Sequence, residues 1–312
     1  MLARVAENIY WLSRYLERAE DTARLLSVNS HLILDLPRAA KPDWSEIIAI
    51  SGDIALFDAL YKQRDEASVL SFMCGDMRYP GSIISSLAAA RENLRTTRDV
   101  IPREMWEEIN QLYLTVRKQV EAGITMRNRD DFLNRVIRCC QTVNGLIESS
   151  LSYTQVHTFL MLGRHLERAD MTTRIIDVRS TNLLARTPGE LTPFETIQWM
   201  SVLKSLTGYQ MYRQHVRLGI RGPDVLCYLL QDSRFPRAVC TCLIRFSNAA
   251  KMLPRHETVM EMVQTSLEHL QEADITALVS EPAKLHNFVD EIQLDFIKIH
   301  EAVVNSYFAR SQ

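Results

Sequence analysis

Residues 12–24 read LSRYLERAEDTAR, and residues 162–174 read LGRHLERADMTTR. Both stretches contain the pattern Arg-x-x-Glu-Arg-Ala followed by an acidic residue. A repeat of such a long period determines the architecture of a chain before any local pattern does. An ordinary solvated helix surface has no physical reason to keep the same charges twice. The repeat therefore predicts two related halves that share a charged helix face.

Two further motifs recur in the same order. DMRYP at residues 76–80 corresponds to DSRFP at residues 232–236, and IPR at residues 101–103 corresponds to LPR at residues 253–255. The offsets between the copies differ by a few residues, as they do when loops of duplicated halves change length. These landmarks support the same register independently of the first repeat.

The repeat predicts the domain organisation. We expect a first helical repeat at residues 1–151 and a second at residues 152–312. No Pro, Gly or charge-rich linker separates them, so we expect the two repeats to pack as one globular body, related by an approximate two-fold axis.

Helical periodicity and proline positions predict an all-α multi-helix bundle. Leu12, Leu16 and Ala19 recur at the spacing of one helix face, and no useful stretch alternates like a strand. The chain has only 10 Gly and 10 Pro in 312 residues, which disfavours turn-rich all-β folds. The predicted helices span residues 3–34, 80–98, 102–123, 131–149, 153–185, 193–206, 236–252, 254–273 and 282–308.

The repeated charged face allows two interpretations. Arg14 and Arg18 are like charges one helical turn apart, which is unfavourable without a partner, and Glu17 between them can neutralise only one. Asp21 lies on the same face. An acceptor from elsewhere is implied. It is a carboxylate on a neighbouring helix or the equivalent glutamate across the two-fold axis, both in a buried network, or an anionic group of a ligand or partner. Arg164, Glu167 and Arg168 repeat the arrangement.

Other charges on these helices have partners within the helix. Glu20 with Arg24, and Asp170 with Arg174, are acid-before-base pairs four residues apart, each worth about 0.2 to 0.5 kcal/mol. We assign these four residues mainly to structure.

A second candidate surface follows Pro80. Arg91, Arg95 and Arg98 fall on one stripe of the predicted helix, at i, i+4 and i+7, with Asn93 off the stripe. The corresponding stretch near residue 247 lacks these arginines. The stripe is either a solvated face paired to nearby acids or an anion-binding surface.

The Asp-x-Arg-aromatic-Pro motif offers a third candidate. It places Arg78 and Arg234 just before a proline, near the unpaired backbone donors of a helix start, where anions bind. The alternative is that the Asp of each motif caps the turn.

Composition and missing motifs exclude several classes of function. A net charge of −2 gives no global attraction for nucleic acid or an anionic membrane. No apolar run reaches about 18 residues and no secretory signal is evident, so we expect a cytoplasmic protein. The sequence has no phosphate-binding loop, nucleophile elbow or metal-binding motif, so we expect no metal. The six cysteines show no paired spacing, which favours reduced core thiols.

Taken together, these residues resemble the bacterial Alpha-E family, all-helical proteins of unknown function named for a Glu-Arg motif. The resemblance covers essentially the whole chain. It rests on MLARVAENIYWLSRYLERAE at residues 1–20, ARENLR at residues 90–95, LERAD at residues 166–170 and FPR, which includes Arg237, at residues 235–237. Two positions depart from the repeat: Met171 stands where the first copy has Asp21, and Gly81 follows Pro80 where Arg237 follows Pro236.

The resemblance implies a role beside other proteins. Members are typically encoded beside, or fused to, a circularly permuted ATP-grasp protein and a transglutaminase-like protein, which suggests a part in forming or modifying peptide or amide bonds. ATP and Mg would belong to the ATP-grasp partner, and this chain would need no cofactor.

Three functional hypotheses follow. The first is a non-catalytic helical accessory subunit that docks the ligase or presents its substrate through the charged face. The second is an enzyme acting on peptides or amides, with Glu17 or Glu167 as acid or base and the arginines as anion clamps. The third is a purely structural homo-oligomer.

Overall fold

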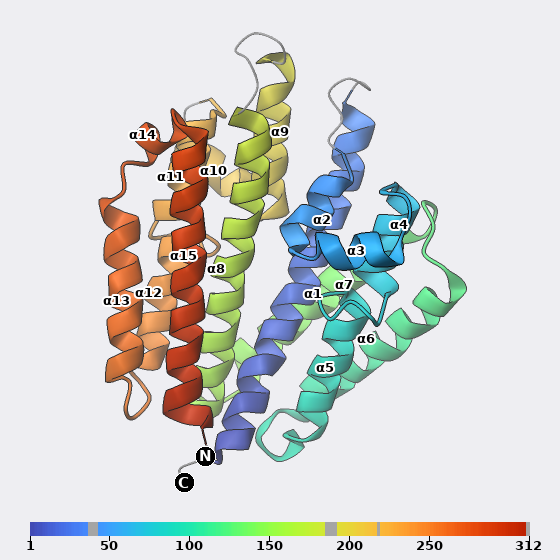
Figure 1. The fold of residues 1–312 in the computed structure, drawn as a ribbon. Coiled ribbons are helices and arrows are strands. Elements are labelled where there is room, and N and C mark those ends of the chain that lie inside the picture. Colours follow the sequence, from blue (N-terminus) through green and yellow to red (C-terminus); the bar gives the residue numbers. More distant parts are fainter. Residues whose placement is uncertain (37–42, 185–191, 217–218, 310–312) are drawn as a thin grey trace.

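The structure, a computed structural model, describes residues 1–36, 43–184, 192–216 and 219–309 (Figure 1). Every regular element within these ranges is helical, so the all-α prediction is confirmed. The longer α-helices are α1 (Ala3–Asp35), α5 (Ile83–Arg95), α6 (Arg103–Ala122), α7 (Arg129–Ser150), α8 (Gln155–Leu184), α9 (Thr192–Ser205), α11 (Gly222–Gln231), α12 (Val239–Ala250), α13 (Glu257–Glu272) and α15 (Pro282–Val303).

The two helices that carry the repeated charges form the centre of the bundle. α1 and α8 run side by side, with α5 and α7 against α1 and with α12 and α15 against α8 (Figure 1). The apolar face of α1 packs into the core, where Leu12, Ala19 and Ala23 are fully buried. Buried apolar residues from Ala6 to Phe308 form one continuous cluster. The division at residue 151 remains a prediction.

A glycine permits the closest approach of the two central helices. A Cβ atom built on Gly163 would lie 2.2 Å from the Ser13 Oγ atom and 2.2 Å from the Tyr10 carbonyl oxygen. Any larger residue would therefore push α8 away from α1. This contact sets the spacing at which side chains further along both helices meet.

Several predicted helix boundaries are accurate because backbone chemistry determines them. α6 begins directly after Pro102 and ends at Gly123, whose φ of 88° is favourable for glycine. The expected helix over residues 80–98 is wrong at both ends. It begins at Ile83 because the Ser82 side chain caps the Ser85 amide, and it ends at Arg95, before a short 3-10 turn.

The helices that follow Pro236 and Pro254 also begin about one turn later than expected, and a π-helical turn ends the last helix. Seven elements of five to ten residues in the described ranges were not predicted from the sequence, because segments of this length gain most of their stability from tertiary packing. These are α2 (Ser45–Ser51), α3 (Ile54–Leu60), α4 (Glu66–Leu70), η2 (Ser71–Gly75), α10 (Tyr209–His215), α11 and α14 (Ile275–Val279).

No helix in the described ranges has both the length and the apolar content needed to cross a membrane. All six cysteines are free, and four of them are buried, as expected for core thiols.

Candidate functional site

The repeated Glu-Arg pairs of α1 and α8 bind each other. Arg18 Nε donates to Glu167 Oε1 at 2.6 Å, and Arg168 donates from Nε and Nη2 to the two Glu17 carboxylate oxygens at 2.7 and 2.9 Å. Both glutamates are only 2% exposed. The like-charged arginines thus find their acceptors on the opposite helix, as the buried-network interpretation expected.

Each glutamate receives a second guanidinium. Arg14 Nε donates to Glu167 Oε2 at 2.6 Å, while Arg237 Nη1 lies 3.0 Å from Glu17 Oε1 and 2.5 Å from Asp21 Oδ1. Arg237 comes from the turn before α12, so the network joins three separate segments of the chain.

The charges in this network perturb one another strongly. Burial, the largest influence, raises the pKa of Glu17, but the neighbouring Arg168 and Arg237 outweigh burial and lower that pKa overall. Arg14 and Arg18 lower the pKa of Glu167 in the same way. Burial raises the pKa of Asp21, and the carboxylates beside it add to that effect beyond what Arg237 offsets.

Arg164 departs from the expected pattern. It does not contact Glu17, although its counterpart Arg14 contacts Glu167. Its Nη2 atom instead donates to Asn144 Oδ1 at 2.8 Å, and its Nη1 atom lies 3.4 Å from Glu148 Oε1 on α7. The expected pairs within helices are formed, with Arg24 to Glu20 at 2.7 Å and Arg174 to Asp170 at 2.9 Å.

The sequence analysis missed one buried polar position of the same interface. Arg179 on α8 donates to Asn29 Oδ1 on α1 at 2.9 Å and also binds Glu46 of α2. Asn29 lies three turns beyond Arg18 on the same face of α1. Following the charged face past residue 24 would have revealed it.

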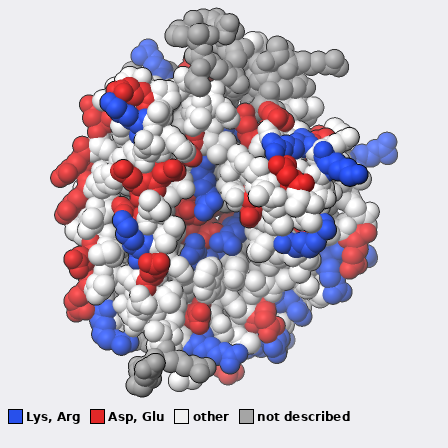
Figure 2. Space-filling model, viewed as in Figure 1, with Lys and Arg blue, Asp and Glu red and all other residues white. Residues whose placement is uncertain are grey.

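A cavity of about 310 Å³ opens beside the network. It lies between α1, α8, the end of α2 and the turn at residues 79–81, and Arg18 and Arg174 both line it. In the space-filling view, basic and acidic side chains gather in a hollow near the centre of this face (Figure 2). The sequence analysis did not foresee the cavity.

The two arginines in this cavity use their Nε atoms internally. Arg18 Nε binds Glu167 and Arg174 Nε binds Asp170; within the described ranges, the terminal nitrogens of both arginines donate no hydrogen bond. Arg18 and Arg174 line the same cavity. They leave unused donors beside the cavity.

Glycines keep the cavity wall open. A Cβ atom on Gly52, where φ is 82°, would lie 2.9 Å from Arg174 Nη1, and one on Gly81 would lie 2.3 Å from Tyr79 Oη. Gly81 and Met171 both line the cavity. These are the two positions where the repeat departs from Arg237 and Asp21, whose side chains are paired and buried.

The arginine stripe after Pro80 does not run along one helix, although Arg91 and Arg98 both lie over the Trp106 ring. Arg91 Nε donates to Asn110 Oδ1 at 2.7 Å, and Arg98 stacks 3.7 Å above the Trp106 ring. Arg95 forms an exposed pair with Glu92. The expectation of one stripe is wrong because α5 ends at residue 95, and Asn93 there is half-buried.

The Asp-x-Arg motif caps turns in both copies. Asp76 Oδ1 accepts the Arg78 amide at 2.9 Å, and Asp232 Oδ1 accepts the Arg234 amide at 2.8 Å. The Arg78 side chain also binds Asp76, and the Arg234 side chain is exposed. The geometry therefore favours capping over anion binding.

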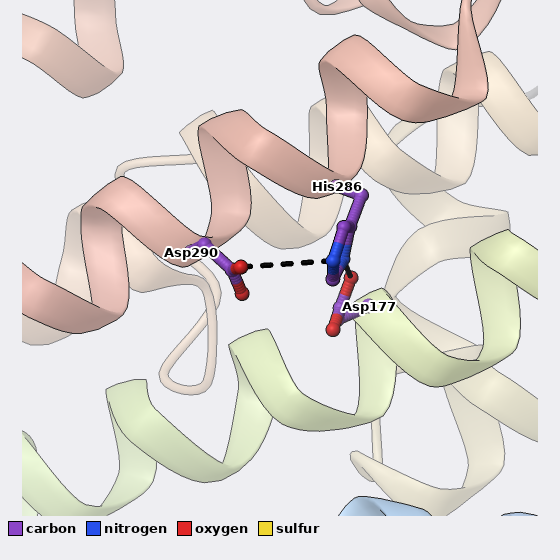
Figure 3. Close-up of side chains that lie close together, drawn as sticks. All are labelled: Asp177, His286 and Asp290. Carbon is purple, nitrogen blue, oxygen red and sulfur yellow. Dashed lines mark hydrogen bonds and ion pairs between the residues drawn. The ribbon is translucent and has the colours of Figure 1, made fainter.

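One group of three side chains with metal-ligand chemistry lies between α8 and α15 (Figure 3). His286 Nδ1 lies 2.6 Å from Asp177 Oδ1, and His286 Nε2 lies 3.6 Å from Asp290 Oδ2. Both ring nitrogens already face carboxylates, so the geometry is that of an exposed ion-pair link between two helices. Sequence spacing could not reveal it, because Asp177 is distant in the chain.

Comparison with known proteins finds relatives in mycobacteria. The chain is 24% identical over 311 residues to an uncharacterized protein of Mycobacterium bovis and to one of Mycobacterium tuberculosis strain CDC 1551, and 23% identical to one of strain H37Rv. Each match covers 90% of this chain and 34% of the relative, so the chain spans about a third of their length. No solved structure matches.

The Alpha-E family, described as a predicted alpha-helical domain with a conserved ER motif, matches residues 1–308. The Glu-Arg pairs of α1 and α8 lie within that match. The chain belongs to the Alpha-E family.

Proposed function

We propose that this chain is a non-catalytic helical subunit that holds a small amino acid or peptide terminus in the cavity beside Arg18 and Arg174. The observation that carries the proposal is the pair of guanidinium groups whose terminal nitrogens are unused at a cavity of about 310 Å³. A planar guanidinium binds a carboxylate through two parallel hydrogen bonds, which suits the carboxylate of such a ligand.

The balance of charge favours a ligand with both signs. Glu167 and Asp170 already offset the two arginines, so the cavity has little net charge to attract a pure anion. Asp53 also lines the cavity, and among the described residues its carboxylate has no ion-pair partner. A ligand amine near Asp53 and a ligand carboxylate near the arginines would satisfy both groups.

The geometry favours binding over catalysis by the glutamates. A general acid or base works best when its pKa lies near the operating pH. Glu17 and Glu167 are each held by two guanidinium groups that lower the pKa of the carboxyl, so both stay ionised. The enzyme hypothesis, with these residues as acid or base, is therefore the weaker alternative.

We also infer that the two halves are related by duplication and by an approximate two-fold axis. The crosswise pairs support this inference, since Arg18 binds Glu167 while Arg168 binds Glu17. The cavity then occupies the place in the first half that Arg237 fills in the second. In this view, loss of one internal arginine opened a site for an external ligand.

We place this subunit in an ATP-grasp-linked system that forms or modifies peptide or amide bonds, in the cytoplasm. The family resemblance is the basis of this part of the proposal. ATP and Mg would be bound by the ATP-grasp partner, and a transglutaminase-like protein is a second candidate partner. The mycobacterial relatives are about three times longer than the match, so they have room for further segments.

The cavity is tested by calorimetric titration of the full chain with alanyl-alanine and with its C-terminal amide. We expect the dipeptide to bind and its amide to bind much more weakly. Arg174→Gln should reduce the affinity for the dipeptide about tenfold, since a hydrogen bond to a charged group is worth about 1.5 to 3 kcal/mol. Arg103→Gln is the matched control, because Arg103 forms an exposed pair with Glu107. Equal binding of dipeptide and amide would refute the proposed ligand.

The accessory role is tested separately by affinity purification from the native cell extract. We expect an ATP-grasp protein to be recovered with the wild-type chain. Turnover of a peptide substrate by the purified chain alone would refute the non-catalytic part, and a stable homo-oligomer without any ligand or partner would favour the structural alternative.

A further inference from the structure

A second cavity, of about 440 Å³, lies between the end of α7, the first half of α8 and the C-terminal part of α12. It shares no lining residue with the cavity beside Arg18. Of the motif residues in the repeated charged face, Arg164 lines this cavity. Its lining is rich in hydrogen-bond donors, which sets it apart from the balanced first cavity.

Two arginines contribute positive charge to this second cavity. Arg164 is buried and oriented by Asn144 and Glu148, so its guanidinium has a defined position. Arg245 is exposed and forms no hydrogen bond or ion pair with the part of the chain that the structure describes. Glu148 is the one acidic residue among the lining residues, and Arg164 already binds it.

Two histidines add further donors. His157 Nε2 and His165 Nδ1 are buried without a hydrogen-bond partner, and both rings line the cavity. Burial and the nearby Arg168 and Arg164 lower the pKa of His165, so its ring is neutral. A buried N–H without an acceptor is costly, so we place the proton of each neutral ring on its other nitrogen. Both histidines then act as donors at the cavity.

We propose that this second cavity binds the phosphoryl group of a phosphate monoester. Two guanidinium groups and two imidazole N–H groups supply donors from two helices, and a phosphoryl group offers three acceptor oxygens and a charge near −2. A carboxylate has only two oxygens and a single charge, so it would leave part of this donor set unused. The rim side chains of Tyr153 and Met252 are 76% and 73% exposed, and they offer apolar surface to the organic part of the ester.

The proposal is tested by calorimetric titration of the full chain with phenyl phosphate, inorganic phosphate and benzoate. We expect phenyl phosphate to bind most tightly, inorganic phosphate more weakly because it lacks the apolar contact, and benzoate most weakly. Arg245→Gln should weaken phenyl phosphate binding about tenfold without changing the melting temperature, because Arg245 forms no hydrogen bond or ion pair with the described residues. When the same ligand is added in an NMR titration, the ring signals of His157 and His165 should shift.

Arg234→Gln is the matched control, since it removes one exposed positive charge outside the cavity. An equal loss of affinity in this variant would show general screening of charge and overturn the site. Benzoate binding as tightly as phenyl phosphate, or no phosphate binding at all, would also overturn it. Dipeptide binding at Arg18 and Arg174 should be unchanged in Arg245→Gln. Failure of the phosphate site can therefore be distinguished from failure of the dipeptide site.

Discussion

Arg168 binds the Glu17 carboxylate through two parallel hydrogen bonds of 2.7 and 2.9 Å that connect α8 to α1 in the interior of the bundle. Arg18 and Glu167 form the crosswise pair at 2.6 Å. Buried charges are costly unless they are paired and hydrogen-bonded, so neither helix could bury this face alone. The Glu-Arg pair of each copy thus forms a contact between two helices.

Glu17→Gln should destabilise the fold strongly. The substitution keeps the shape of the side chain but leaves the buried Arg168 without its carboxylate partner, while Arg237 keeps Asp21. Breaking a buried pair costs about 3 to 5 kcal/mol. Urea unfolding measures the loss. Glu107→Gln is the control, since Glu107 pairs with Arg103 on an exposed face, and it should change stability by less than about 1 kcal/mol. Equal effects of both variants would contradict a buried network.

Gly163→Ala should also destabilise the fold, by about 1 to 3 kcal/mol, because the added methyl group overlaps Ser13 and the Tyr10 carbonyl. Gly145→Ala is the matched control, since a Cβ atom there meets nothing within 4 Å and the residue lies in α7. That variant should gain roughly 0.4 to 1 kcal/mol from lower entropy of the unfolded chain. A stable Gly163→Ala protein would mean that α1 and α8 are not in such close contact.

Acid should unfold the protein through Glu167. Arg14 and Arg18 outweigh the effect of burial and lower the pKa of Glu167 to about 2. A carboxyl with a lowered pKa stabilises the fold above its unfolded pKa, about 4.3, and that contribution is lost as the pH falls through the folded value. Stability should therefore drop between about pH 4 and pH 2.

Denaturant titrations at several pH values measure this effect. Glu167→Gln should show a smaller drop over the same pH window, because it has no carboxyl to protonate. Glu167 is a better probe than Glu17, because Glu17 lies beside Asp21. The pKa of Asp21 is raised, so its effect on the pH dependence of stability is opposite to that of a carboxyl with a lowered pKa. An unchanged pH profile in Glu167→Gln would contradict the assignment.

His286 should titrate above its usual range. Its hydrogen bond to Asp177 raises the pKa of the imidazole. The protonated ring stabilises the link between α8 and α15 fully below the unfolded pKa, about 6.5, and the contribution is lost as the pH rises through the folded value. NMR titration of the ring measures it. The same titration in Asp177→Asn should return the pKa toward about 6.5, and no difference between the two proteins would refute the pairing.

The sequence by itself determined the helical class, the repeated charged pattern of residues 12–24 and 162–174, and the helix ends next to Pro102 and Gly123. Periodicity and backbone chemistry are local properties, so one sequence carries them fully. It also showed that the like-charged Arg14 and Arg18 need acceptors, because the shortage of negative charge beside them can be seen on a single helix.

Tertiary structure alone decided which acceptors they find. Distances between helices decide these partners, and no spacing along the chain encodes those distances. They pair Glu167 with Arg14 and Arg18, bring Arg237 from a distant turn to Glu17, and place Arg164 against Asn144. The short helices α2 to α4 and both cavities share this dependence. Helix propensity acts between neighbours in sequence, whereas burial and ion pairing act between neighbours in space.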